Sequence, residues 1–360
     1  AKYNGFKLKD EFGGSMGPSN LVYIEKILNE NNVFDYGIKT FEELVKSGQI
    51  KYTAGRQYYI DTLKKKIDTE LISKSGVKIV YDAMYGSGQG MMDDLINITK
   101  LRCEVNPSFG GSSPEPVFKN LSLIAETLKK GNYDIGIVTD GDADRIAIFD
   151  ENGNFVDSQK TFALLLLYLL EDKKMSGDIV RGFSSSELIK KICDDYKLKL
   201  ITVPIGFKYI SELMIKKDIL IGAEESGGIG LKNHLPERDG IFNGMMFSEM
   251  LASKKKKLSL LISDIEDKYG KFYYKRIDKH LSDNSLKAKL IDLTRNLKEV
   301  AGLKVISKDE LDGVKLIFEK GWLLVRASGT EPLLRIYTET FDENKVDDIL
   351  NDIQKKFNLF

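Results

Sequence analysis

The feature that most constrains the fold is a pattern of strands and helices that occurs twice along the chain. Apolar, strand-like segments alternate with helical segments through residues 77–140, and the same order returns through residues 179–224. Strands that alternate with helices predict parallel or mixed sheets, whose ligand sites lie beyond the carboxyl ends of the strands. Each repeat places acids just after its third strand, at Asp140 and at Glu224. The sequence therefore predicts two α/β domains with acids where ligand sites belong.

The segments outside the two repeats have other patterns. Residues 1–18 predict a strand and a glycine-rich loop, and a helix follows them. Residues 53–74 predict one long charged helix that leads into the first repeat. Residues 269–360 interleave strands with helices, which predicts a separate α+β domain. The predicted fold class is α/β, with two βαβαβ domains of mixed or parallel sheets at 53–157 and 158–268, followed by the C-terminal α+β domain.

Composition excludes several classes of protein. Lys plus Arg and Asp plus Glu both number 54, so the formal charge is zero, which argues against a nucleic-acid partner. The longest apolar run, residues 162–170, is much shorter than the ~20 residues of a membrane span, which argues against a membrane partner. Two cysteines, Cys103 and Cys193, are too few for a disulfide scaffold and predict a reducing, cytoplasmic setting.

Three carboxylates follow the third strand of the first repeat, at Asp140, Asp142 and Asp144. In an extended segment, side chains at i, i+2 and i+4 point the same way, so these three should converge. Two like charges at ~4 Å repel by roughly 4 kcal/mol near a protein surface, so the cluster needs a cation. Hard oxygen ligands suit Mg²⁺. A solvated acidic turn and an aspartyl-phosphate phosphatase that uses Asp140 are alternatives. A calcium EF-hand is rejected, because Arg145 stands where its loop needs glycine.

Two further loops carry groups that suit a sugar phosphate. The stretch Ala223–Gly228 follows a strand of the second repeat, and its carboxylates and hydroxyl can hydrogen-bond sugar hydroxyls, although a plain turn is the alternative. The stretch Arg326–Pro332 lies between two apolar strands, with Arg335 on the second of them. Arginine, hydroxyl groups and glycine amides together suit a phosphate, and a decorated β-turn is the alternative there.

With these loops in order, the sequence resembles the α-D-phosphohexomutase family, the phosphoglucomutases and phosphomannomutases. The metal, sugar and phosphate loops occur in family order, and Gly206–Lys208 matches the run before the sugar loop. The stretch Asn4–Lys7 matches the residues that follow the family's catalytic serine loop. The resemblance covers nearly the whole chain. It implies an isomerase, an intramolecular phosphotransferase, that interconverts hexose 1-phosphate and 6-phosphate through a phosphoserine and a hexose 1,6-bisphosphate.

The resemblance also implies roles for individual residues. The metal ligands would be Asp140, Asp142 and Asp144, holding Mg²⁺ against the seryl phosphate. The catalytic residues would be Arg145, which stabilises the phosphoryl oxygens, and Lys7 and Lys208, which handle the proton of the attacking sugar hydroxyl or clamp a phosphate. Substrate would be bound by Glu224 and Ser226 at the sugar hydroxyls and by Arg326, Ser328, Gly329, Thr330 and Arg335 at the non-reacting phosphate.

The sequence departs from the family pattern in its first domain. No Ser-His-Asn run occurs, so the serine loop is absent, and residues 1–52 would be a remnant of a first α/β domain. That domain could act as a separate piece, or this chain could be a sugar-phosphate binding module without catalysis. Gly228 replaces a histidine common in members that handle mannose, so glucose phosphates are the expected substrates, with mannose phosphates as the alternative.

Overall fold

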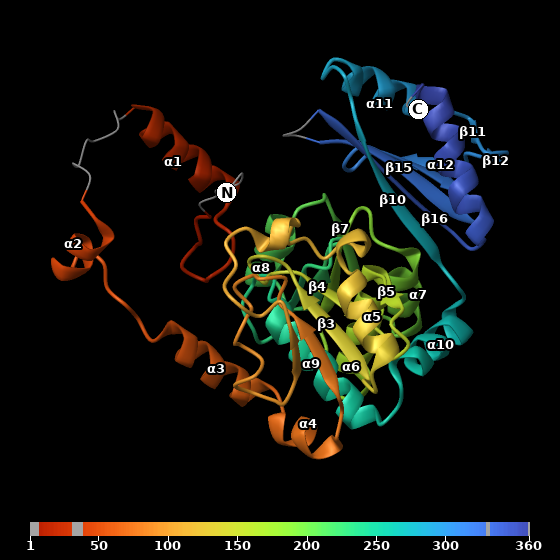
Figure 1. The fold of residues 1–360 in the computed structure, drawn as a ribbon. Coiled ribbons are helices and arrows are strands. Elements are labelled where there is room, and N and C mark those ends of the chain that lie inside the picture. The colour runs from red at the N-terminus through yellow and green to blue at the C-terminus, as the bar shows by residue number, and fades with distance from the viewer. Residues whose placement is uncertain (1–6, 31–38, 329–331, 359–360) are drawn as a thin grey trace. The chain divides into compact units, whose positions relative to one another are not determined.

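A computed structural model describes residues 7–30, 39–328 and 332–358 of the chain (Figure 1). The chain packs as two units, the first made of Ala1–Phe155 with Leu235–Lys255 and the second of Val156–His234 with Lys256–Phe360. In the described part, no helix is long and apolar enough to cross a membrane. The predicted fold class is confirmed, because two mixed α/β sheets precede a C-terminal antiparallel sheet.

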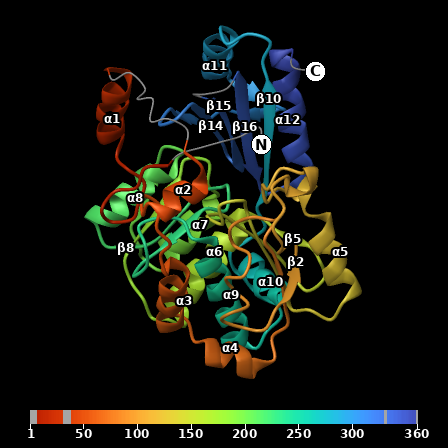
Figure 2. The same ribbon diagram turned by 60° about the vertical axis from the view of Figure 1, so that its left-hand side comes forward.

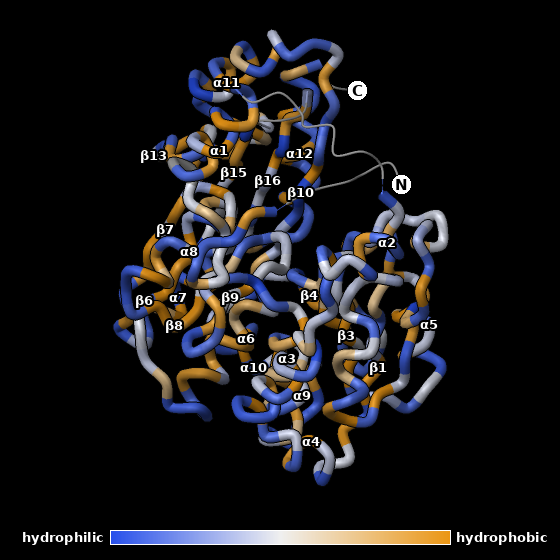
Figure 3. Tube along the Cα trace, turned by 90° about the vertical axis from the view of Figure 1, so that its left-hand side faces the viewer, coloured by the Kyte–Doolittle hydropathy of each residue, from blue (hydrophilic) through white to orange (hydrophobic). Residues whose placement is uncertain are grey.

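The first unit is built on a sheet whose strands lie in the order β2-β1-β3-β4-β5. The strand β1 (Ile79–Asp82) runs parallel to β2 (Thr99–Leu101) and β3 (Ile135–Thr139), whereas β4 (Ile146–Phe149) runs antiparallel to β3. The strand β5 (Phe155–Val156) forms one edge of the sheet and β2 the other. All residues of β1, β3 and β4 are buried, so these strands are continuous apolar runs and not alternating ones. The tube of β1 and β3 is mainly orange in the hydropathy colouring (Figure 3).

Helices cover both faces of this sheet. Consecutive strand residues point to opposite faces. Val138 joins a core with α5 (Ser122–Lys130), while its neighbour Ile137 lies against Gly244 of α9 (Gly240–Lys254). The result is an α/β/α sandwich whose third strand leads directly into the acidic loop. Two short 3-10 turns, η1 (Phe109–Gly111) and η2 (Phe118–Asn120), precede α5.

The predicted helix over residues 53–74 is broken in the structure. It forms as α3 (Gly55–Lys66) and α4 (Thr69–Ser75), separated by an extended Ile67. The break has a local cause, because the side chain of Asp68 accepts a hydrogen bond from the amide of Leu71 and so starts a new helix. The helices before this point are α1 (Pro18–Glu30) and α2 (Phe41–Lys46).

The second unit begins with a sheet of the same design, in the order β7-β6-β8-β9. The strand β6 (Asp178–Gly182) is parallel to β7 (Leu200–Val203) and β8 (Ile219–Ala223), and β9 (Ile229–Leu231) is antiparallel to β8. One face of the sheet packs on α8 (Phe207–Lys216). The remaining helices, which pack against one another, are α6 (Ser158–Glu171), α7 (Glu187–Asp195) and α10 (Leu258–Tyr269) (Figure 2).

The second unit ends with an antiparallel sheet in the order β10-β16-β15-β14-β13. Its strands are β10 (Tyr273–His280), β13 (Ser307–Asp309), β14 (Val314–Phe318), β15 (Gly321–Ala327) and β16 (Leu333–Thr340). Two helices, α11 (Leu286–Asn296) and α12 (Glu343–Phe357), bury their apolar residues against this sheet. A small pair, β11 (Glu299–Val300) and β12 (Leu303–Lys304), lies between α11 and β13 in the sequence. The boundaries of the four predicted domains remain a prediction.

Candidate active-site loops

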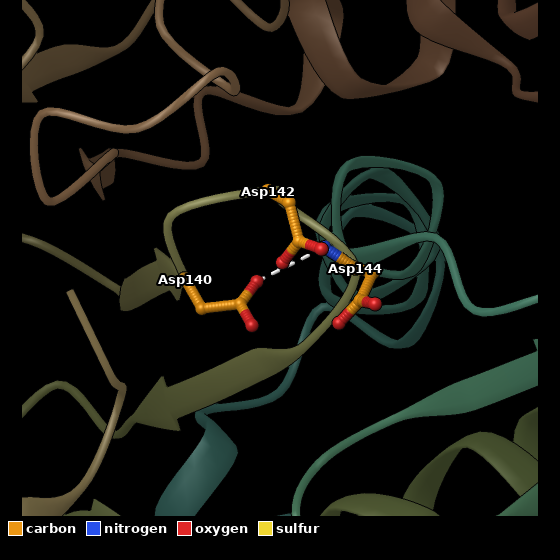
Figure 4. Close-up of side chains that lie close together, drawn as sticks. All are labelled: Asp140, Asp142 and Asp144. Atoms are coloured by element: carbon orange, nitrogen blue, oxygen red, sulfur yellow. Dashed lines mark hydrogen bonds between the residues drawn. The ribbon is translucent and has the colours of Figure 1, made fainter. Parts of the chain in front are cut away.

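The acidic loop joins β3 to β4 and gathers its three carboxylates on one side. Ligand oxygens of Asp140, Asp142 and Asp144 all lie within 4.8 Å of one another (Figure 4). The loop is a tight turn, not the extended segment that the sequence suggested. Its cause is local: Oδ1 of Asp140 accepts hydrogen bonds from the amides of Asp144 at 3.0 Å and Arg145 at 3.1 Å, and Ala143 has a φ of 59°.

Cations of the first unit surround these carboxylates. Lys7 contacts Asp142 and lies 3.6 Å from Asp144, and the Arg145 Nε lies 3.7 Å from Asp140. Burial, with the charge of Asp144, raises the pKa of Asp140 to about 7. Burial also acts to raise the pKa of Asp142, but the hydrogen bond and charge of Lys7 bring it below the usual range. The Lys7–Asp142 pair is more than half exposed, so it contributes little to stability.

The donor set fits a divalent cation. The buried Oδ1 of Asp144 accepts no hydrogen bond from the residues that the structure describes. An oxygen that is buried and unsatisfied costs free energy, which a cation would recover. Carboxylate oxygens are the ligands of hard ions such as Mg²⁺.

Sequence reasoning missed the segment Glu237–Asp239, which braces this loop. The Arg238 guanidinium donates to Asp144 at 2.6 Å, and Asp239 accepts from the Tyr59 hydroxyl and caps α9. Glu237 accepts from Lys9 at 2.5 Å and thereby holds the N-terminal segment. An acid just before an apolar helix is a recognisable cap signal. Arg238 and Asp144 are 94 residues apart in the sequence, so no local sequence pattern predicts their contact.

A cavity of about 410 Å³ borders the acidic loop within the first unit. This volume is in the range of small-ligand sites. Its polar lining combines the carboxylates of the loop with arginines and a serine from neighbouring elements. The lining includes Asp142, Asp144, Arg238, Arg56 and Ser87.

The sugar loop joins β8 to β9 in the second unit. The amide of Glu224 donates to the Gly228 carbonyl at 2.9 Å, which closes a tight turn, and Gly227 has a φ of 85° that favours glycine. Glu224 is buried, whereas Ser226 is half-buried. Lys208, at the start of α8, is exposed and lies over the Tyr209 ring at 5.0 Å.

The predicted phosphate loop joins β15 to β16 in the same unit. Arg326 and Arg335 are directly paired across the two strands, so two cations face each other in register. Such a pair is unfavourable unless anions neutralise it. Asp312 accepts from Arg326 at 2.9 Å, and Asp278 lies 4.0 Å from Arg335. Ser328 is buried where the loop begins.

The loop residues Gly329 and Thr330 lie outside the described residues. The acidic loop belongs to the first unit, and the sugar and phosphate loops belong to the second. The prediction that all three serve one site therefore remains a prediction.

Comparison with known proteins identifies the family. Three family models match the chain, all described as phosphoglucomutase/phosphomannomutase. They are alpha/beta/alpha domain II at residues 57–153, alpha/beta/alpha domain III at 157–269 and the C-terminal domain at 287–356. These matches cover the second, third and fourth domains of the family and none covers its first domain.

Relatives that match most of the chain are named as sugar-phosphate mutases. A phosphoglucomutase/phosphomannomutase of Thermococcus kodakarensis is 30% identical over 97% of this chain and 74% of its own length. A phosphoglucosamine mutase of Methanococcus maripaludis is 30% identical over 98% of this chain and 77% of its own length. The crystal structure of a Thermus thermophilus protein, provisionally classed as a phosphomannomutase, superposes with a TM-score of 0.82. It is 29% identical and is matched over 97% of this chain and 74% of its own. The relatives are mutases, so the predicted enzyme class is confirmed, and the chain belongs to the α-D-phosphohexomutase family.

Proposed function

We propose that this chain provides the metal, sugar and phosphate sites of a phosphohexomutase that interconverts hexose 1-phosphate and hexose 6-phosphate through a hexose 1,6-bisphosphate. The observation that carries the proposal is the acidic loop, where Asp140, Asp142 and Asp144 converge and Asp144 keeps a buried oxygen unsatisfied among the described residues. The facing arginines Arg326 and Arg335 support it, because they supply a second, anion-binding site.

The three aspartates would hold Mg²⁺. When bound there, the ion supplies charge that neutralises the oxygens of the phosphoryl group in transit. Arg145 stands 3.7 Å from Asp140 and 3.8 Å from Asp144, so its guanidinium can add to that positive charge. The serine that carries the phosphoryl group in this family has no counterpart in these 360 residues.

Lys7 and Lys208 are the candidates for the proton of the attacking hydroxyl. Burial lowers the pKa of Lys7, but the hydrogen bond to Asp142 and the charge of Asp144 raise it above the ordinary value. Lys7 therefore keeps its proton at neutral pH and suits a general acid or a phosphate clamp better than a base. Lys208 is exposed at a helix start. A hydroxyl could approach it without displacing another side chain.

The residues of the sugar loop support a hexose phosphate as the substrate class. Glu224 and Ser226 would bind two hydroxyls of a hexose, so that the sugar can enter in either of two orientations. The form Glu-Glu-Ser-Gly-Gly favours glucose phosphates. Glucosamine phosphates are the second candidate, because the Methanococcus maripaludis relative is a phosphoglucosamine mutase.

The first test is a mutase assay on the 360-residue chain. It supplies glucose 1-phosphate, a trace of glucose 1,6-bisphosphate and Mg²⁺, and it follows glucose 6-phosphate. We expect no turnover by the chain alone and turnover once a family first domain with its serine loop is added. Binding of glucose, mannose and glucosamine 6-phosphates by calorimetry then ranks the sugars. If the added first domain restores no turnover while sugar phosphates still bind, the chain is a binding module.

The second test addresses the metal. We expect Asp142→Asn to weaken Mg²⁺ binding by roughly 10- to 100-fold, and the exposed control Asp61→Asn to leave it unchanged. Release of inorganic phosphate with a phosphorylated Asp140, detected by mass spectrometry, would instead support an aspartyl-phosphate phosphatase.

A further inference from the structure

Glu225 stands in the middle of the sugar loop, between the two residues expected to bind the sugar. Its backbone carbonyl accepts a hydrogen bond from the Ser158 hydroxyl at 2.6 Å, at the start of α6. Its side chain is only 5% exposed. A carboxylate that is buried to this extent needs partners, and those partners identify what the side chain does.

The partners of Glu225 lie on the C-terminal sheet. The Tyr337 hydroxyl donates to Oε1 of Glu225 at 3.2 Å, and a guanidinium nitrogen of Arg276 lies 3.9 Å from the same oxygen. Arg276 of β10 and Tyr337 of β16 are directly paired across the two strands. The sugar loop is therefore held by one hydrogen bond, from Tyr337, and one ion pair, with Arg276, on the C-terminal sheet.

The same strands carry the interaction on to the phosphate loop. Arg276 donates to both carboxylate oxygens of Asp278, at 2.7 and 2.6 Å, and Asp278 lies 4.0 Å from Arg335. Arg335 pairs in register with Asp278 on one side and with Arg326 on the other. Charges therefore alternate without interruption from Glu225 to the arginine pair.

The series of alternating charges ends at Arg326, whose partner Asp312 contacts the segment that follows β7 of the second α/β sheet. Asp312 accepts from Arg326 at 2.9 Å and from the backbone amide of Ile205, also at 2.9 Å. Ile205 stands three residues before Lys208. Two acids, Glu225 and Asp312, thus tie the C-terminal sheet to the segments that carry the sugar and proton-handling residues.

We propose that Glu225 is a positioning residue that couples the sugar loop to the arginine pair through Arg276, so that a hexose phosphate spanning both sites is recognised as one ligand. This proposal rests on the proposed function for its ligand. The contacts that it invokes do not depend on that function. Glu225 need not touch the sugar, since its carboxylate is already engaged by Tyr337 and Arg276.

The first measurement uses the full chain without ligand. Glu225→Ala should make amide hydrogen exchange faster by about tenfold both in the sugar loop and in the strand segment around Arg335, because both lose a shared anchor. Glu225→Gln keeps an acceptor for Tyr337 and should show a smaller effect. Glu212→Gln removes an exposed carboxylate paired with Lys216 on α8 and serves as the control. Faster exchange in the sugar loop alone, or in neither segment, overturns the coupling.

The second measurement compares two probes by calorimetry. Glucose 6-phosphate can reach both sites, whereas inorganic phosphate can reach only the arginine pair. We expect Glu225→Ala to weaken glucose 6-phosphate binding by about tenfold while phosphate binding changes less than twofold. Equal losses for the two probes would mean general damage and overturn the proposal. If the unmodified chain binds no hexose phosphate, the proposed function fails, and the exchange measurement alone decides the coupling.

Discussion

The loop after β3 and the loop after β8 occupy the same place in two sheets that share the order of four strands, yet their acidic side chains have different partners. In each sheet two parallel pairs are followed by an antiparallel return strand, β4 or β9. In the first loop, Asp140, Asp142 and Asp144 face one another. In the second, the Glu225 carboxylate accepts a hydrogen bond from Tyr337 on the C-terminal sheet.

This difference shows that topology sets where a loop stands and that its surroundings set what it binds. The carboxylates of the first loop converge because Asp140 accepts two amides of its own turn. The second loop closes through a backbone hydrogen bond between Glu224 and Gly228. Its side chains are therefore not needed to form the turn and can contact other groups. The first loop concentrates negative charge, and the second distributes hydrogen-bonding groups.

The largest effect should come from the ends of the first strands, where the two sheets also differ. In the first sheet Asp82 is fully buried, and its Oδ1 accepts a hydrogen bond from the Arg102 Nε at 2.8 Å. We expect Arg102→Met to lower the free energy of unfolding by about 3–5 kcal/mol, because it leaves a buried carboxylate unpaired. In the second sheet Arg181 pairs with Glu187, whose side chain is 35% exposed, so Glu187→Gln should cost no more than about 1 kcal/mol.

Urea unfolding of the two variants measures this contrast. The double variant Asp82→Leu with Arg102→Met should recover most of the loss, since no charge is then stranded. Equal destabilisation by Arg102→Met and Glu187→Gln would break the comparison between the sheets.

The next effect is a pH dependence that belongs to the second unit. Lys315 is 4% exposed, and burial lowers its pKa to about 8 from an ordinary value of 10.5. Between these values the unfolded chain binds more protons than the folded chain, so Lys315 makes stability rise with pH through this window. The rise amounts to about 3 kcal/mol. Lys315→Met should abolish it.

Unfolding can be followed at pH 7 and at pH 10.5 through Trp322, the single tryptophan of the chain, whose ring centroid lies 4.0 Å from the Lys315 ammonium. A stability difference between Lys315→Met and the unmodified chain that is the same at both pH values would show that Lys315 titrates normally.

A third effect separates the two loops by their glycines. A Cβ at Gly86 would lie 2.7 Å from the carbonyl oxygens of Asp140 and Gly141, which are backbone atoms that cannot move aside. We expect Gly86→Ala to lower the free energy of unfolding by ~2–3 kcal/mol and to disturb the acidic loop. At Gly227 a φ of 85° strains any L side chain, so Gly227→Ala should cost about 1 kcal/mol. Thermal unfolding with and without Mg²⁺ measures both, and a smaller cost at Gly86 would contradict the close approach.

Sequence reasoning succeeded where the signal was local. The apolar runs of β3 and β8 predicted buried strands, and the acids that follow each run, Asp140 and Glu224, predicted the loops. It also predicted the strands that carry Arg326 and Arg335. Each of these features is written in a few consecutive residues.

It failed where partners are distant along the chain or where a side chain competes with the backbone. The Arg238–Asp144 contact and the Tyr337–Glu225 contact join segments 94 and 112 residues apart. No periodic pattern in the sequence predicts such contacts. The break between α3 and α4 was missed because Asp68 stands inside an apolar helical pattern, where it caps the second helix.

The smallest effect concerns the hydroxyl that holds the sugar loop. Ser158→Ala removes the hydrogen bond to the Glu225 carbonyl and should lower the free energy of unfolding by about 1 kcal/mol. The matched control Ser73→Ala removes an exposed hydroxyl bond to Thr69 within α4 and should change it by less than about 0.5 kcal/mol. The first loop has its equivalent bond in the Asp140 side chain, so Ser158→Ala should leave Mg²⁺ affinity unchanged while it weakens glucose 6-phosphate binding. A loss of Mg²⁺ affinity in Ser158→Ala would mean that the two loops are not independent, and the comparison between them would have to be abandoned.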